Sequence, residues 1–166
     1  MKIFLKIFIF FILHSYTFAE TSIAYIDLDS LLSKTNIGKN LFEKLNKSEN
    51  LKMQELQEQE KKLKDEENKI IASKNLISEE QLKNDIKKFK KKLNDYKSLK
   101  SSELDKLQET RNNEVNNLLG TINSVIKSYM DENLITIIID KKNIYIAHKK
   151  HDITDTLIEL INKSIK

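Results

Sequence analysis

The sequence predicts an α+β fold: a small β body formed by association of chains, from which each subunit extends a long antiparallel two-helix coiled-coil arm. Three observations support this prediction. The chain has 33% charged residues, no proline and two glycines, a composition typical of long helices. Apolar residues recur at helical and heptad spacings through its middle. Short β-branched runs stand at both ends of that helical region.

Residues 1–19 have the features of a secretory signal peptide. Lys2 and Lys6 precede an apolar run at residues 7–13, and Thr17 and Ala19 occupy the small positions that a signal peptidase recognises. We therefore expect export, with cleavage after Ala19. The alternative is an uncleaved membrane anchor, although the apolar run is shorter than the ~20 residues that span a bilayer. Because the chain has no cysteine, disulfides cannot stabilise it.

The body is predicted to combine residues 20–38 with residues 132–166. The first segment holds a strand in "IAYIDLDSLL", then a short helical turn and a connection that closes at Gly38. The second holds strands at residues 135–139 and 144–147, which flank a "DKKN" hairpin turn, and a last helix capped by Asp152. The residues predicted to build the body are Ile23, Tyr25, Ile135, Ile137, Ile139, Ile144 and Ile146.

These strands and one short helix are too small a domain to stand alone without cysteine. A domain of roughly 45 residues usually needs oligomerisation, a metal or disulfides to be stable. The run "ITIII" is apolar on both faces, so both faces need to be covered. We therefore expect the strand segments of several chains to combine.

The arm is predicted over residues 39–131, as helices at 39–73 and 79–131 joined by a turn near residues 75–79. In the first helix, Leu56, Leu63 and Ile70 stand at intervals of seven residues. In the second, apolar residues alternate at spacings of four and three, at Leu82, Ile86, Phe89, Leu93 and Tyr96.

Ser78 and Gln81 have the spacing of a capping box, which predicts that the second helix begins after Ser78. Helices joined by so short a turn lie antiparallel and cover each other's apolar stripes. This arrangement places Ile70 near Ile86.

Positive charge gathers toward the predicted turn. Residues 74–100 contain nine lysines and four acidic residues, whereas residues 52–67 contain four lysines and six acidic residues. One interpretation is a basic tip that attracts acidic clients or anionic lipid head groups. The other is a solvated helix face whose lysines reflect compositional bias, with Phe89 in the seam between the helices. The candidate client-binding lysines are Lys83, Lys87, Lys88, Lys90, Lys91, Lys92 and Lys97.

Several function classes lack support in the sequence. His148, His151 and Asp152 could suggest a metal site, but they lie in a lysine-rich loop with no cysteine or further histidine in residues 20–166. Asp27, Asp29 and Asp140 follow predicted strands, where turn and cap roles explain them. No nucleophile with a base and no phosphate-binding loop is present, and a formal net charge of +4 is small for a nucleic-acid binder. We expect a protein that is not an enzyme, with no cofactor, no metal and no nucleic-acid partner.

The two ends of the chain resemble the Skp (OmpH) family of periplasmic chaperones. The similar segments are "IAYIDLDSLL" with Gly38 after it, and "IIIDKKNIYIAHKKHDITDTLIELIN". The resemblance implies a periplasmic homotrimer with three helical hairpins projecting from a shared β-barrel body. It also implies that unfolded outer-membrane proteins are held in the cavity between the arms, without ATP. The competing hypothesis is an exported coiled-coil spacer or adaptor that docks on one partner.

Overall fold

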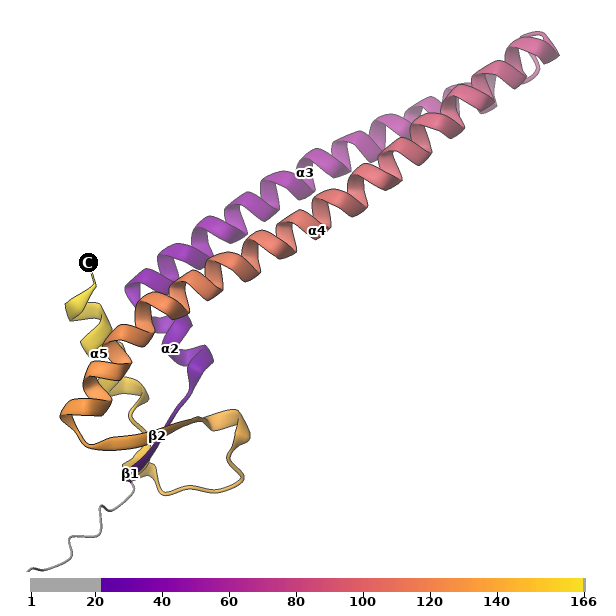
Figure 1. The fold of residues 1–166 in the computed structure, drawn as a ribbon. Helices are drawn as coiled ribbons and strands as arrows, with labels where there is room; N and C mark the ends of the chain where they lie inside the picture. Colours follow the sequence, from indigo (N-terminus) through magenta and orange to yellow (C-terminus); the bar gives the residue numbers. More distant parts are fainter. Residues whose placement is uncertain (1–21, 166) are drawn as a thin grey trace, which may run out of the picture.

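The computed structural model describes residues 22–165 of the chain. Figure 1 shows a long helical arm projecting from a small body that contains both strands and both chain ends of the described region. The predicted signal peptide lies outside the described residues. The elements are β1 (Ser22–Ile26), α2 (Leu28–Lys34), α3 (Asn36–Ser73), α4 (Glu79–Glu132), β2 (Ile135–Asp140), the 3₁₀ turns η1 (Lys141–Asn143) and η2 (Lys149–His151), and α5 (Thr154–Ser164).

The two strands pair in parallel, although more than a hundred residues separate them in sequence. Ile23 pairs with Ile137 and Tyr25 with Ile139, after an irregularity in register between Ser22 and Ile23. A parallel pair needs a crossover connection, and here the whole α2–α3–α4 excursion provides it. The prediction that the first strand finds its partner beyond the helical region is confirmed.

The predicted hairpin around "DKKN" is wrong. Lys141–Asn143 form η1, in which the Asp140 carboxylate accepts a hydrogen bond from the backbone N–H of Lys142 at 3.2 Å. Residues 144–147 form no strand, and Tyr145 and Ile146 are 100% and 84% exposed. Their alternating pattern suits a strand, but a strand requires a neighbour to take its backbone hydrogen bonds, and none of residues 22–165 does so.

Gly38 does not close a connection, as predicted, but lies in the first turn of α3. Thr35 caps that helix, its hydroxyl accepting a hydrogen bond from the Gly38 N–H at 3.3 Å. The chain bends sharply between α2 and α3, which brings the Leu32 carbonyl oxygen to 1.6 Å from where a Cβ on Gly38 would stand. Gly38 is therefore required by this close backbone approach and not by a turn conformation.

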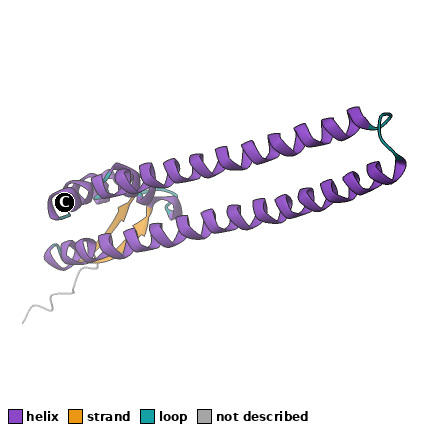
Figure 2. Ribbon diagram, turned by 90° about the horizontal axis from the view of Figure 1, so that it is seen from above, coloured by secondary structure: helices purple, strands orange, loops and turns teal. Residues whose placement is uncertain are grey.

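The predicted long helices are confirmed as α3 and α4, which run antiparallel (Figure 2). At ~1.5 Å per residue, their 38 and 54 residues correspond to lengths of about 57 and 81 Å. The N–H of Gln81 donates to the Ser78 hydroxyl at 3.3 Å, so Ser78 caps α4 as predicted. No helix within residues 22–165 has the length and apolar character needed to cross a membrane.

The hydrophobic core lies where α2, α5 and the last turns of α4 meet one face of the strands. Leu31 and Leu157 are fully buried there. From α4 come Leu118, Ile122 and Ile126, spaced four residues apart on one helix face. The C-terminal turns of the longer helix thus contribute to the core of the body, although they fall within the range predicted as arm.

The last helix begins at Thr154, two residues after the predicted cap. The Asp152 carboxylate accepts hydrogen bonds from the N–H and the hydroxyl of Thr154, at 3.1 and 2.6 Å. The Thr154 hydroxyl also accepts from the Asp27 N–H at 2.9 Å, which links α5 to the end of β1. Asp152 therefore stabilises the start of α5, with Ile153 between them as the N-terminal flanking residue.

Candidate functional site

The seven candidate lysines all lie on the tip half of α4, and their side chains are exposed. Two of them form ion pairs: Lys92 Nζ lies 2.7 Å from Glu66 on α3, and Lys91 Nζ lies 3.2 Å from Asp95. Within residues 22–165 the other five make no ion pair. The basic surface available at the tip consequently consists of Lys83, Lys87, Lys88, Lys90 and Lys97, with Lys74 at the turn.

The seam beneath this basic surface contains an open groove, which we call the tip groove. Its volume is about 440 Å³, and Glu67, Lys74 and Lys90 stand among its lining residues. The apolar part of the lining comes from both helices: Ile70, Ile71, Leu82, Ile86, Phe89 and Leu93. Phe89 is half-buried in this seam, as its heptad spacing predicts.

A polar cluster joins the two helices on the body side of the tip groove. Tyr96 is 8% exposed, and its hydroxyl lies 3.1 Å from the Leu56 carbonyl oxygen and 3.0 Å from a Glu60 carboxylate oxygen. Lys100 Nζ lies 3.1 Å from the same carboxylate. Hydrogen bonds from Lys100 and then Tyr96 lower the pKa of Glu60, while burial and then Glu60 raise the pKa of Tyr96. This cluster ties the arm together at mid-length.

Arg111 joins the helices nearer the body and is the single arginine of the sequence. Its guanidinium donates to Glu49 at 2.8 Å and lies 5.8 Å from the centre of the Phe42 ring. A planar cation can pair with a carboxylate and stack on a ring at once, which a lysine ammonium does less well. The sequence analysis did not predict this contact, although a single arginine in a chain otherwise rich in lysine could have pointed to it.

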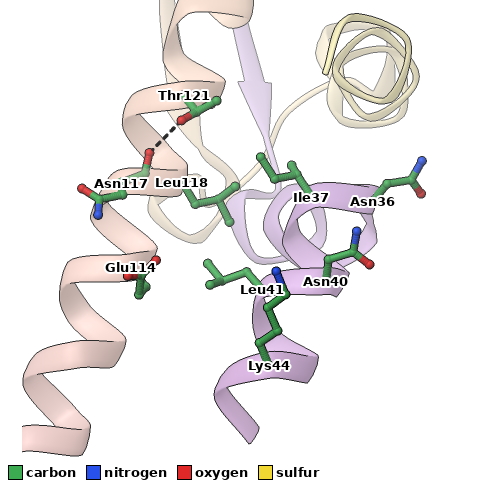
Figure 3. A pocket seen from close by; sticks show the side chains of 9 residues that line it. All are labelled: Asn36, Ile37, Asn40, Leu41, Lys44, Glu114, Asn117, Leu118 and Thr121. Atoms are coloured by element: carbon green, nitrogen blue, oxygen red, sulfur yellow. Dashed lines mark hydrogen bonds between the residues drawn. The ribbon is translucent and has the colours of Figure 1, made fainter. Parts of the chain in front are cut away.

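A second groove lies at the base of the arm, where α3 and α4 enter the body (Figure 3). Its volume is about 400 Å³. Ile37, Leu41 and Leu118 approach one another across it, and polar side chains from both helices surround them. Because the floor is continuous with the core through Leu118, we assign this groove to the packing between arm and body.

The candidate body residues divide between the strands and the irregular segment after η1. Ile23 and Tyr25 lie in β1, and Ile135, Ile137 and Ile139 in β2. Ile144 and Ile146 lie outside both strands. Ile23 and Ile137 pair with each other and are each 44% exposed, so this end of one face of the strand pair is apolar and uncovered, whereas Tyr25 on the same face is 9% exposed.

The acidic residues after the strands have local structural roles. Asp27 accepts a hydrogen bond from the Ser30 N–H at 2.9 Å and caps α2, and this bond is the main cause of its lowered pKa. Lys142 Nζ lies 2.7 Å from Asp29, which raises the pKa of Lys142. His148 Nδ1 accepts from the Lys150 N–H at 3.2 Å. Asp27, Asp29 and His148 therefore each have a local structural contact within the described chain.

The chain matches a protein family by sequence and a solved structure by fold. The family model for outer membrane protein (OmpH-like) matches residues 22–161. No curated protein matches the chain. A similar crystal structure is that of a "putative outer membrane chaperone (OmpH-like)" from Caulobacter crescentus CB15. It has a TM-score of 0.77 at 16% identity, covering 88% of this chain and 86% of that chain. The resemblance suggested by the terminal segments is confirmed: the chain belongs to the OmpH-like family.

Proposed function

We propose that the protein is an ATP-independent holdase chaperone of the periplasm, which holds unfolded outer-membrane proteins between its arms and prevents their aggregation. Membership of the OmpH-like family supports a chaperone role. The observation that carries the proposal is the arm, two long helices whose exposed surface combines lysines with uncovered apolar side chains. Such a surface can attract an unfolded chain through many weak contacts without an enclosed catalytic site.

The working form is a homotrimer in which the strands of three subunits combine. Ile23 and Ile137 on the outer face of the strand pair need a cover. Tyr145 and Ile146 are exposed in a segment with strand-like alternation, and no strand among residues 22–165 pairs with it. Association supplies both the cover and the missing hydrogen bonds, and it places three arms around one cavity.

In this proposal the signal peptide directs export of the protein and is cleaved after Ala19. The partners are unfolded outer-membrane β-barrel proteins, and anionic lipid is a further candidate because it meets the same basic surface at the tip. The alternative function is an exported coiled-coil spacer or adaptor, which would hold one folded partner permanently.

The test is aggregation of an unfolded β-barrel membrane protein diluted out of urea, followed by light scattering without nucleotide. We expect residues 20–166 to suppress scattering when present at one trimer per client. The adaptor function predicts scattering identical to that of the client alone, and this result would contradict the holdase proposal.

A further inference from the structure

We propose that the tip groove seats an apolar segment of an unfolded client whose neighbouring residues are carboxylates. The inference rests on the proposed holdase function and narrows it to one chemical preference at one site. It assigns the tip an anchoring role, distinct from general enclosure between the arms.

The groove presents apolar side chains that the arm itself does not cover. Ile71 is 63% exposed and Ile86 is 38% exposed, one on each helix. Phe89 lies half-buried beside them. The volume of about 440 Å³ is in the range of ligand pockets, about 300–1,000 Å³. A client side chain entering the groove would remove this apolar surface from water.

The helices can accept such a side chain without breaking polar contacts. Lys92 with Glu66, at 2.7 Å, is the ion pair between α3 and α4 nearest the turn within the described chain. Beyond it the helices meet through the apolar lining of the groove. The Tyr96 hydroxyl, 3.1 Å from the Leu56 carbonyl oxygen, holds the arm together on the body side.

The charge around the groove indicates which residues should flank the apolar segment. Lys74 and Lys90 belong to the lining, and exposed Lys83 and Lys87 directly follow Leu82 and Ile86 in sequence. Glu67 is the one acidic residue of the lining. A client with carboxylates next to its apolar side chain therefore complements the rim, whereas one with ammonium groups is repelled.

The same features favour a polypeptide over a membrane. The apolar side chains lie in a groove between two helices and share it with Glu67, which would face anionic head groups. In an extended chain, residues two apart point to the same side, so one apolar residue can enter the groove while carboxylates two residues before and after it reach the lysines.

The test uses fluorescence anisotropy with a labelled synthetic peptide at low salt. The peptide is unfolded and has an apolar centre between aspartates, and a second peptide has lysines in place of the aspartates. We expect Ile71→Gln to bind the acidic peptide at least fivefold more weakly than wild type. The matched control is Leu51→Gln, because Leu51 is 53% exposed on the same helix and away from the groove. Leu51→Gln should bind the acidic peptide less than twofold more weakly than wild type does. The lysine peptide should bind wild type at least fivefold more weakly than the acidic peptide does.

Equal losses in the two variants, or equal binding of the two peptides, would overturn the inference. The inference would also be overturned if Ile71→Gln lost binding to phosphatidylglycerol vesicles but kept binding to the acidic peptide. Circular dichroism checks that both variants keep their helices. If wild type suppresses client aggregation yet shows no peptide preference, the groove inference fails and the holdase proposal stands. If the peptide preference appears without suppression of aggregation, the holdase proposal fails alone.

Discussion

At the scale of single residues, the two glycines of the chain occupy opposite environments. Gly38 lies where a Cβ would stand 1.6 Å from the Leu32 carbonyl oxygen and 2.9 Å from the Thr35 hydroxyl. Gly120 lies within α4, and a Cβ there would meet nothing within 4 Å. The first glycine is required by backbone packing between α2 and α3. In one subunit the second has no packing reason and lowers the intrinsic stability of its helix.

Substituting each glycine by alanine should therefore change stability in opposite directions. We expect Gly38→Ala to destabilise the protein by ~2 kcal/mol or more, because the backbone must shift. Gly120→Ala should stabilise it by about 0.5–1 kcal/mol, the difference in helix propensity. Urea unfolding at fixed protein concentration, followed by circular dichroism, measures both. Loss of stability in Gly120→Ala would contradict this and point to close approach of another chain at Gly120.

At the scale of elements, the arm is held by an apolar seam with polar links spaced along it. From body to tip, these links join Glu49 to Arg111, Lys52 to Glu103, Glu60 to Lys100 and Glu66 to Lys92. Hydrogen bonds lower the pKa of Glu60, chiefly from Lys100, and that of Glu103, chiefly from Lys106. Hydrogen bonds to carboxylates raise the pKa of Lys52 and Lys100. Each exposed pair contributes little alone.

These pKa shifts predict how stability depends on pH. A lowered carboxylate pKa stabilises the folded arm above the ordinary value of 4.5, and the contribution is lost as pH falls through the folded pKa. A raised lysine pKa stabilises it below the ordinary value of 10.5, and the contribution is lost as pH rises through the folded pKa. We therefore expect Tm to fall at both extremes.

Glu60→Gln should show a smaller fall in Tm between about pH 7 and pH 3 than wild type, because the titrating carboxylate is gone. Glu67→Gln is the control, since Glu67 makes no ion pair within residues 22–165 and its loss should leave the acid decline unchanged. Thermal melts by circular dichroism measure these falls. Parallel acid declines in Glu60→Gln and wild type would show that the mid-arm cluster does not govern the effect.

At the scale of the whole molecule, the body leaves Ile23 and Ile137 each 44% exposed on one face of the strand pair, and the proposed trimer would cover them. We expect wild type to be a trimer at micromolar concentration in analytical ultracentrifugation. Ile137→Asp should dissociate or unfold it, because a charge would replace an apolar side chain in the covered face. Ile71→Asp is the control: Ile71 is exposed at the tip and far from the strands, so the trimer should persist. A folded monomeric wild type would contradict the proposed assembly.

The basic surface at the tip should act through its charge. Changing Lys83, Lys87, Lys88, Lys90 and Lys97 together to glutamate should weaken capture of acidic unfolded clients more than tenfold at low salt. The effect should nearly vanish at about 1 M salt, where the screening length is ~3 Å. The matched control reverses five exposed lysines of α3, which are Lys39, Lys47, Lys61, Lys62 and Lys64. Equal weakening in both variants would show that net charge matters and the tip does not.

Much of the architecture could be predicted because it depends on local periodicity. Heptad spacing and the Ser78–Gln81 pair located both long helices and the turn between them. β-branched runs predicted β1 and β2 at the two ends of the helical region. Because no other strand pattern lies between them, the first strand was predicted to find its partner beyond that region. The candidate lysines could be placed on one helix for the same reason, although their role in client binding stays a prediction.

What the sequence alone determined is therefore the type and approximate length of β1, α3, α4, β2 and α5, because spacing along the chain sets which face of a helix or strand is apolar. Only the tertiary structure decided which faces meet. It placed Leu118, Ile122 and Ile126 in the core of the body and bent the chain closely at Gly38. Within the part of the chain that the structure describes, it also gave residues 144–147 no strand partner, since a strand depends on a neighbour that no local pattern specifies.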